Sequence, residues 1–215
     1  MKKNFHQLIF AVLMCLIIVP ASAQVTTKEA KKALKLRPPK EVRKQAKEYT
    51  KDGYYVAVGA PTIERQLTTA WMREVETDDN GFPRLIPGYG SAVGETQIAA
   101  KLQATEAAKL ELAGSIASNV AALIENNFAN AQLNTQEASS VTQTVAASKN
   151  IIAQEIGRTI PLVELYKNMG NNIEANIRIA YSSEMAMEMA KKVVREQLED
   201  KANILQDKLD KLMKF

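Results

Sequence analysis

The chain has very little of the residue types that most catalytic and metal sites use. Its 215 residues include one His, one Cys and one Trp, and aromatic residues make up 6%. Both His6 and Cys15 lie within the first 23 residues. The remainder therefore cannot build a Ser-His-Asp triad, a Cys-His pair, a His-ligated metal centre or a disulfide within one chain.

The first 23 residues have the pattern of a secretory signal peptide. Lys2 and Lys3 give a positive start, Leu8 to Val19 form an apolar run, and Ala21-Ser22-Ala23 form a small-residue cleavage site. The run is shorter than the ~20 residues that a membrane-spanning helix needs. We therefore expect cleavage after Ala23 and export to the periplasm or the outer membrane.

Two alternatives to cleavage are open. A bacterial lipoprotein would be modified at Cys15, although Met14 stands where a small residue is usual and the apolar run continues to Ile18. An uncleaved leader would act as an anchor. No later stretch predicts a spanning helix, so we expect the remainder to be soluble or peripheral.

The positive charge is concentrated near the start of the expected mature chain. The formal net charge is +4, and removal of Lys2 and Lys3 leaves +2. Residues 24–51 hold ten basic and three acidic side chains, hence +7, and the rest carries −5. This segment indicates either contact with an anionic envelope surface or a solvated helix. The candidate contact residues are Lys31, Lys32, Arg43 and Lys44.

Acidic and sulfur-containing clusters offer weak candidate sites. Asp78 and Asp79 beside Glu76 suggest an acid/base pair or a calcium site, but the spacing does not match an EF-hand loop and a solvated turn explains it better. Met185, Met187 and Met189 suggest copper(I), but residues two apart on a helix do not face one another, which favours core packing. A hydrolase using Asp78 and Asp79, or a Ser-Lys pair, is a third-ranked hypothesis.

Two further motifs have structural interpretations. The run from Tyr89 to Gly94 has two of the glycines of a dinucleotide loop but lacks the third and the preceding strand, so we interpret it as a flexible approach to a helix. Trp71 with Tyr54 and Tyr55 suggests an aromatic platform for a glycan or peptide. Packing within the fold is the alternative.

The first half of the chain predicts short elements. Pro38-Pro39 precedes a charged helix over 41–51, and Tyr54 to Val58 predicts a strand. A short helix passes through Leu67 and Trp71. Residues 77–90 predict a long surface connection.

The second half predicts long helices and a hairpin. Alanines at helical spacing predict a helix from about 95 to 130, and a second helix follows, ending near Gly157. Strands at 160–166 and 173–180 predict an antiparallel hairpin. The fold class is therefore α+β, with a small antiparallel sheet packed against long helices and a helical C-terminal extension.

The last predicted helix has a coiled-coil-like pattern. Its apolar residues follow a 4-3-4-3 spacing, typical of an oligomer seam. They are Leu198, Ala202, Leu205, Leu209 and Leu212. The alternative is a terminal helix packed on its own domain or on the basic N-terminal helix. The expected organisation is a signal peptide (1–23), a basic segment (24–52), an α+β domain (53–182) and a C-terminal helix (183–215).

Three segments carry a family resemblance over roughly residues 54–190. They are Gly88 to Ala92, the Ala-rich run from Ala99 to Ala113, and Asn176 to Tyr181. The chain resembles the small outer-membrane lipoproteins of the Helicobacter type, which include flagellum-associated envelope proteins, and exported proteins of unassigned function from Bacteroides-type bacteria. The resemblance implies a compact α+β domain and a non-catalytic envelope role, often in assemblies.

These observations favour an exported, non-enzymatic envelope protein that acts through protein–protein contacts, with itself or with other envelope proteins. The alternative is a binding module that recognises envelope glycan or anionic lipid through the basic segment. We expect no cofactor, no metal and no nucleic-acid partner.

Overall fold

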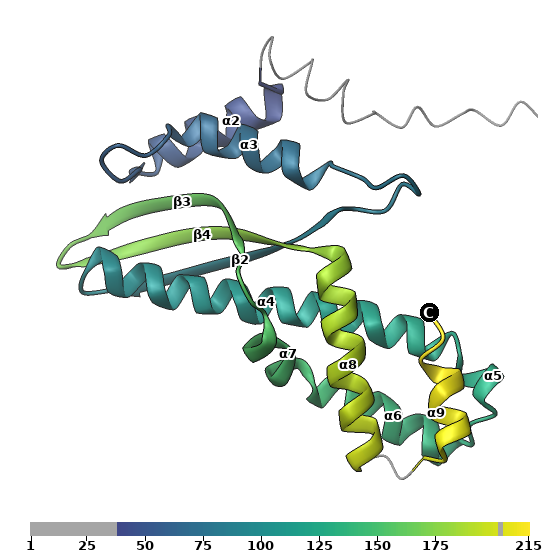
Figure 1. Ribbon diagram of the computed structural model, residues 1–215. Helices are drawn as coiled ribbons and strands as arrows, with labels where there is room; N and C mark the ends of the chain where they lie inside the picture. Colours follow the sequence, from purple (N-terminus) through teal and green to yellow (C-terminus); the bar gives the residue numbers. More distant parts are fainter. Residues whose placement is uncertain (1–37, 202–203) are drawn as a thin grey trace, which may run out of the picture.

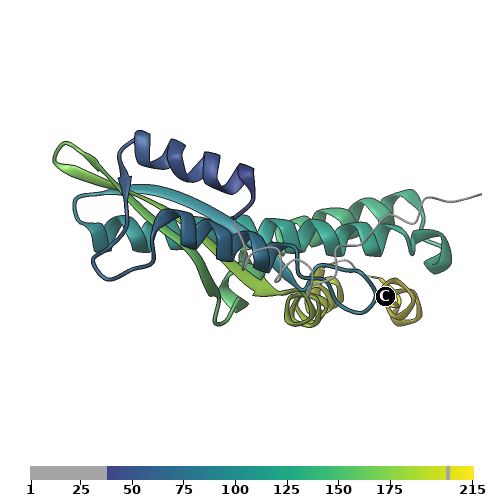
Figure 2. The same ribbon diagram turned by 90° about the horizontal axis from the view of Figure 1, so that it is seen from above.

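The computed structural model describes residues 38–201 and 204–215 and confirms the α+β class. A four-stranded antiparallel sheet has the order β1-β3-β4-β2. Helices α2 and α3 lie over one face of this sheet and α4 lies under the other (Figures 1 and 2). The strands are β1 (Tyr54–Tyr55), β2 (Leu85–Gly94), β3 (Ile160–Met169) and β4 (Asn172–Ser182). The helices are α2 (Lys40–Lys51), α3 (Ile63–Glu74), α4 (Gln97–Glu125), α5 (Phe128–Ala131), α6 (Thr135–Ala147), α7 (Lys149–Glu155), α8 (Ser183–Lys201) and α9 (Gln206–Leu212).

The predicted hairpin is confirmed. β3 and β4 pair antiparallel from Ile160↔Ala180 to Met169↔Asn172, around a turn in which Gly170 has φ 71°. A bulge at Leu162 interrupts the register between Pro161 and Val163. The predicted strand at 54–58 is shorter than expected, because only β1 pairs with β3.

The prediction of a surface connection over 77–90 is wrong for its second part. β2 pairs with β4 along its whole length, from Leu85↔Ser182 to Gly94↔Ile173. A Cβ on Gly88 would lie 2.5 Å from the carbonyl oxygen of Ala108, and one on Gly90 would clash with the Ala104 carbonyl. The glycines therefore let α4 lie close beneath this strand, and they do not form a flexible approach to the helix.

The alanine face of α4 packs on the sheet as predicted. Ala100, Ala104 and Ala108 are fully buried there, and Thr96 caps the helix by accepting a hydrogen bond from the Ala99 N–H. By length and composition α4 is also long and apolar enough to cross a membrane, which the sequence did not lead us to expect. In the fold, 39% of its most apolar stretch is buried. Its packing under the sheet identifies it as a core helix.

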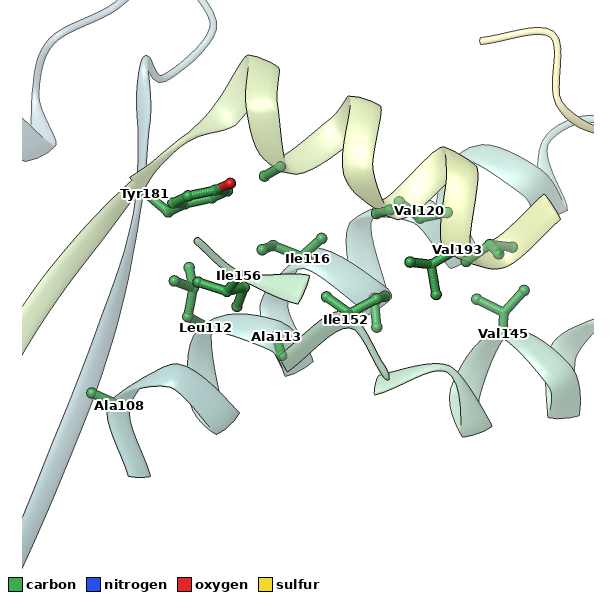
Figure 3. Close-up of a cluster of buried hydrophobic side chains, with 14 of the residues drawn as sticks. Ala108, Leu112, Ala113, Ile116, Val120, Val145, Ile152, Ile156, Tyr181 and Val193 are labelled. Carbon is green, nitrogen blue, oxygen red and sulfur yellow. The ribbon is translucent and has the colours of Figure 1, made fainter. Parts of the chain in front are cut away.

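The predicted second helix is divided in two. Asn134 and Glu137 form a capping box at the start of α6, as the sequence indicated. The helix stops at Ala147, and the buried Ser148 hydroxyl donates to the Thr144 carbonyl at 2.9 Å. α7 then turns so that Ile152 reaches the core between α4 and α8 (Figure 3).

The C-terminal helix is also divided, and this corrects the predicted oligomer seam. α8 ends at Lys201 and α9 begins at Gln206, so no continuous helix carries the 4-3-4-3 spacing. Leu198, Leu209 and Leu212 are at most 1% exposed inside the chain's own core, whereas Leu205 is 71% exposed. Leu residues already covered by their own fold cannot form an intermolecular seam, and packing on the chain's own domain is the arrangement observed.

Two apolar cores hold the layers together. The larger core lies between α4, the sheet face that α4 covers, and helices α5 to α9. Within it, Val193 of α8 lies near Ile152 and Val145 (Figure 3). The smaller lies between the α2–α3 pair and the other sheet face and includes Val42 and Leu67. α2 is thus fixed to the domain through this smaller core, and its outer side is free to face solvent.

Candidate functional site

The most distinctive surface feature is a row of lysines along α2. Lys40, Lys44, Lys47 and Lys51 follow one another at spacings of four, three and four residues, which places them on one side of a helix. All four side chains are exposed, while Val42 and Ala46 on the opposite side are buried. We call these four residues the lysine row.

Little acidic charge neutralises this row. In the described part of the chain, the only one of the four with an ion pair is Lys44, which lies 3.8 Å from Glu48. Both partners are more than 60% exposed, so this pair contributes little to stability. Counting Arg43 with the row, α2 carries five basic and two acidic side chains. The helix therefore presents an unneutralised positive strip to solvent.

The structure places the predicted contact residues unequally. Lys44 belongs to the lysine row. Arg43 lies at its margin, half-buried, and its Nε is buried with no hydrogen-bond partner among residues 38–201 and 204–215. Lys31 and Lys32 fall outside the described residues. Lys40, Lys47 and Lys51 were not among the predicted contact residues, although their helical spacing is present in the sequence.

A groove of about 790 Å³ runs beside the row, between α2, β1 and the start of α3. Apolar groups from Ala46, Val56 and Ile63 line it, and Lys47 and Lys51 stand on its α2 side. The further lining residues are Thr50, Tyr54, Tyr55, Thr62 and Glu64. The groove thus combines an apolar lining with basic side chains.

The tyrosines beside the groove pack against neighbouring side chains. Tyr54 makes an edge-to-face contact with Tyr49 at 5.1 Å between ring centroids, and the Lys167 ammonium lies 5.5 Å from its ring centre. Burial, with a smaller contribution from Glu174, raises the pKa of Tyr54 to about 12. The Tyr55 hydroxyl donates to Asn168 Oδ1 at 3.2 Å.

The structure does not form the predicted aromatic platform. Trp71 and Tyr54 pack in the smaller core, whereas Tyr55 packs against the larger one on the other side of the sheet. Consecutive strand residues point to opposite faces, which separates the two tyrosines.

The acidic loop is a turn. Asp78 Oδ1 accepts hydrogen bonds from the backbone N–H groups of Asn80 and Phe82, each at 2.9 Å, and Asp79 lies 3.9 Å from an Arg84 nitrogen. Within residues 38–201 and 204–215, no group of three His, Cys, Asp or Glu side chains is arranged to hold a metal ion.

The methionines of α8 differ in burial. Met187 and Met189 pack against the larger core, whereas Met185 is 53% exposed. The predicted core packing therefore holds for Met187 and Met189 and is wrong for Met185.

The lysine row and its groove are therefore the arrangement on which a functional interpretation can rest. Comparisons of this chain with protein-family models, with curated proteins and with solved structures found no match.

Proposed function

We propose that this chain is an exported, non-enzymatic envelope protein that attaches to an anionic lipid surface through α2. The observation that carries the proposal is the exposed lysine row, three of whose four members have no ion pair in the described part of the chain. Each basic side chain near an anionic bilayer contributes about 1 kcal/mol of attraction. Four on one side of a rigid helix act together.

In the proposed mechanism, the lysines of α2 attract the negatively charged lipid headgroups, and the fixed helix holds these lysines on one side. Because α2 is fixed to the domain by Val42 and Ala46, its lysines reach a surface without reorganising the helix. The basic residues predicted at 24–37 precede α2 directly and extend the same charge. Export rests on the signal-peptide pattern of residues 1–23, and the envelope role agrees with the resemblance to Helicobacter-type lipoproteins.

Cosedimentation of the exported chain with phosphatidylglycerol vesicles tests the proposal. Replacement of Lys40, Lys44, Lys47 and Lys51 by Gln is expected to weaken binding about tenfold or more. A control variant carries Gln at four other exposed lysines and removes the same total charge. These are Lys192, Lys201, Lys211 and Lys214.

The control variant is expected to bind within about twofold of the unmodified chain, because its lysines lie away from α2, and raised salt is expected to weaken binding of both. Equal losses in the two variants would show that net charge alone acts. Binding to cell-wall glycan but not to vesicles would also contradict the proposal.

Assembly is a second candidate, and a different surface favours it. Ile98 and Leu102, one helical turn apart on the outward side of α4, are 74% and 63% exposed. Two large apolar side chains in that position suit contact with a second copy of the chain. The Leu198–Leu212 region no longer supports assembly.

A further inference from the structure

The groove beside α2 is lined by residues that suit a ligand with a negatively charged group and an apolar group. The half-buried Val56 and Ile63 supply apolar surface, and Lys47 and Lys51 lie one turn apart along one side. Among the described residues, the only carboxylate that lines the groove is that of Glu64, at the start of α3. The groove therefore has an apolar lining, and two positive side chains and one negative side chain border it.

The two lysines are available to a ligand. Neither Lys47 nor Lys51 forms an ion pair in the described part of the chain, and both are exposed. Thr50 lies between them, where its hydroxyl donates to the Ala46 carbonyl at 2.9 Å. An ammonium on a flexible stem binds phosphate as a point charge, and two of them one turn apart can share one phosphate.

Sugar stacking does not suit this groove. A sugar ring binds an aromatic side chain through an open ring face, but Tyr49 packs against Tyr54 and Lys167 lies over the same ring. Inorganic phosphate alone would leave the apolar surface of Val56 and Ile63 uncovered. An acyl-glycerol carrying a phosphate satisfies both parts of the lining.

We propose that this groove seats the phosphate and the first acyl-glycerol carbons of one anionic phospholipid, with Lys47 and Lys51 on the phosphate and Val56 and Ile63 against the carbons. This inference rests on the proposed function and adds to it a defined site for a single lipid molecule.

The test uses dihexanoyl phosphatidylglycerol below its micelle concentration, titrated into the exported chain and followed by calorimetry. Thr50→Trp fills the groove without changing charge, and Thr50→Ser is its matched control. Because Thr50 is exposed, both variants are expected to fold, which circular dichroism checks. We expect saturable binding that Thr50→Trp weakens about tenfold or more and Thr50→Ser leaves within about twofold.

Two further titrants separate the contributions to binding. Dihexanoyl phosphatidylcholine lacks net charge and glycerol phosphate lacks acyl chains, and each is expected to bind at least about tenfold more weakly than dihexanoyl phosphatidylglycerol. Equal binding of either one, unchanged binding in Thr50→Trp, or no saturable binding would overturn the lipid site.

Vesicle cosedimentation of Thr50→Trp separates this inference from the proposed function. The variant keeps all four lysines, so we expect it to bind phosphatidylglycerol vesicles nearly as well as the unmodified chain. Vesicle binding without short-chain lipid binding would refute the groove site alone. Absence of vesicle binding by the unmodified chain would refute both the groove site and the proposed function.

Discussion

Single atoms decide how closely α4 approaches the sheet. A Cβ on Gly94 would lie 2.6 Å from the Ala100 nitrogen, and one on Gly90 would meet both the Ala104 carbonyl and the Ala108 nitrogen. These neighbours are backbone atoms of a long helix, which cannot move aside individually. Gly114 differs, because a Cβ there would meet only the flexible end of the Lys149 side chain, at 3.1 Å.

We expect Gly90→Ala to lower the free energy of unfolding by about 3 kcal/mol or more, since overpacking against a rigid helix displaces the helix or the strand. Gly114→Ala, inside α4, is expected to range from no change to a gain of about 1 kcal/mol, because alanine favours helix. Urea denaturation followed by circular dichroism measures both. A neutral Gly90→Ala would show that α4 lies farther from β2 than described.

At the scale of elements, side chains accept hydrogen bonds from backbone N–H groups at both edges of the sheet. β2 is an edge strand, and its Tyr89 N–H donates to Glu111 Oε2 of α4 at 3.1 Å. On the other side, the Glu164 N–H of β3 donates to Gln66 Oε1 of α3 at 2.7 Å. Unpaired edge groups invite pairing with another chain. Both helices therefore supply an acceptor where the sheet supplies none.

Replacement of Glu111 by Ala is expected to leave the fold intact, with a stability change below about 1 kcal/mol, and to promote concentration-dependent association through the β2 edge. Glu111→Gln retains a carbonyl oxygen that can accept from the Tyr89 N–H and serves as the control. Size-exclusion chromatography over a range of concentrations measures the difference. Identical elution of the Ala variant and the unmodified chain at every concentration would exclude this protective role.

At the scale of the whole molecule, the lysine row and the exposed pair Ile98 and Leu102 lie on opposite sides of the sheet. The lysine row faces outward from α2 above the sheet, while Ile98 and Leu102 lie on α4 below it (Figure 1). One side of the molecule thus suits an anionic surface and the other suits a second copy. Contact with lipid through α2 leaves the α4 side accessible.

Light scattering on residues 24–215 tests assembly through α4. We expect the unmodified chain to associate at high concentration, and the double replacement of Ile98 and Leu102 by Ser to shift it toward the monomer. Leu205→Ser replaces the one residue of the predicted seam that is exposed in the described part of the chain. It is expected to leave association unchanged, because its neighbours Leu209 and Leu212 are buried. A strictly monomeric chain, or loss of association in Leu205→Ser, would contradict this assignment.

Local patterns predicted the elements whose partners are near in sequence. The alternation from Ile173 to Ala180 and the turn at Gly170 specify the β3–β4 hairpin, and Asn134 with Glu137 specifies the start of α6. The 4-3-4 spacing of the lysines in α2 is equally local, although only Lys44 of these four was among the predicted contact residues. These features depend on hydrogen bonds and side-chain periods within a few residues.

Patterns that fit two environments were misread. Glycines between Gly88 and Gly94 indicate a loop when taken locally, yet here they make room for α4. Leucines at heptad-like spacing suit an intermolecular seam or a core equally, and the break between α8 and α9 turned Leu209 inward. In both segments the partner lies outside the local window.

The sequence by itself determined the α+β class, the alanine face of α4, the hairpin and the basic character of α2, because these follow from local periodicity and composition. Only the tertiary structure decided that the glycine run is a strand, that Leu198, Leu209 and Leu212 are core residues, and that a groove opens beside the lysines. The physical reason is that close approach and burial depend on distant segments meeting, which no single stretch of sequence specifies.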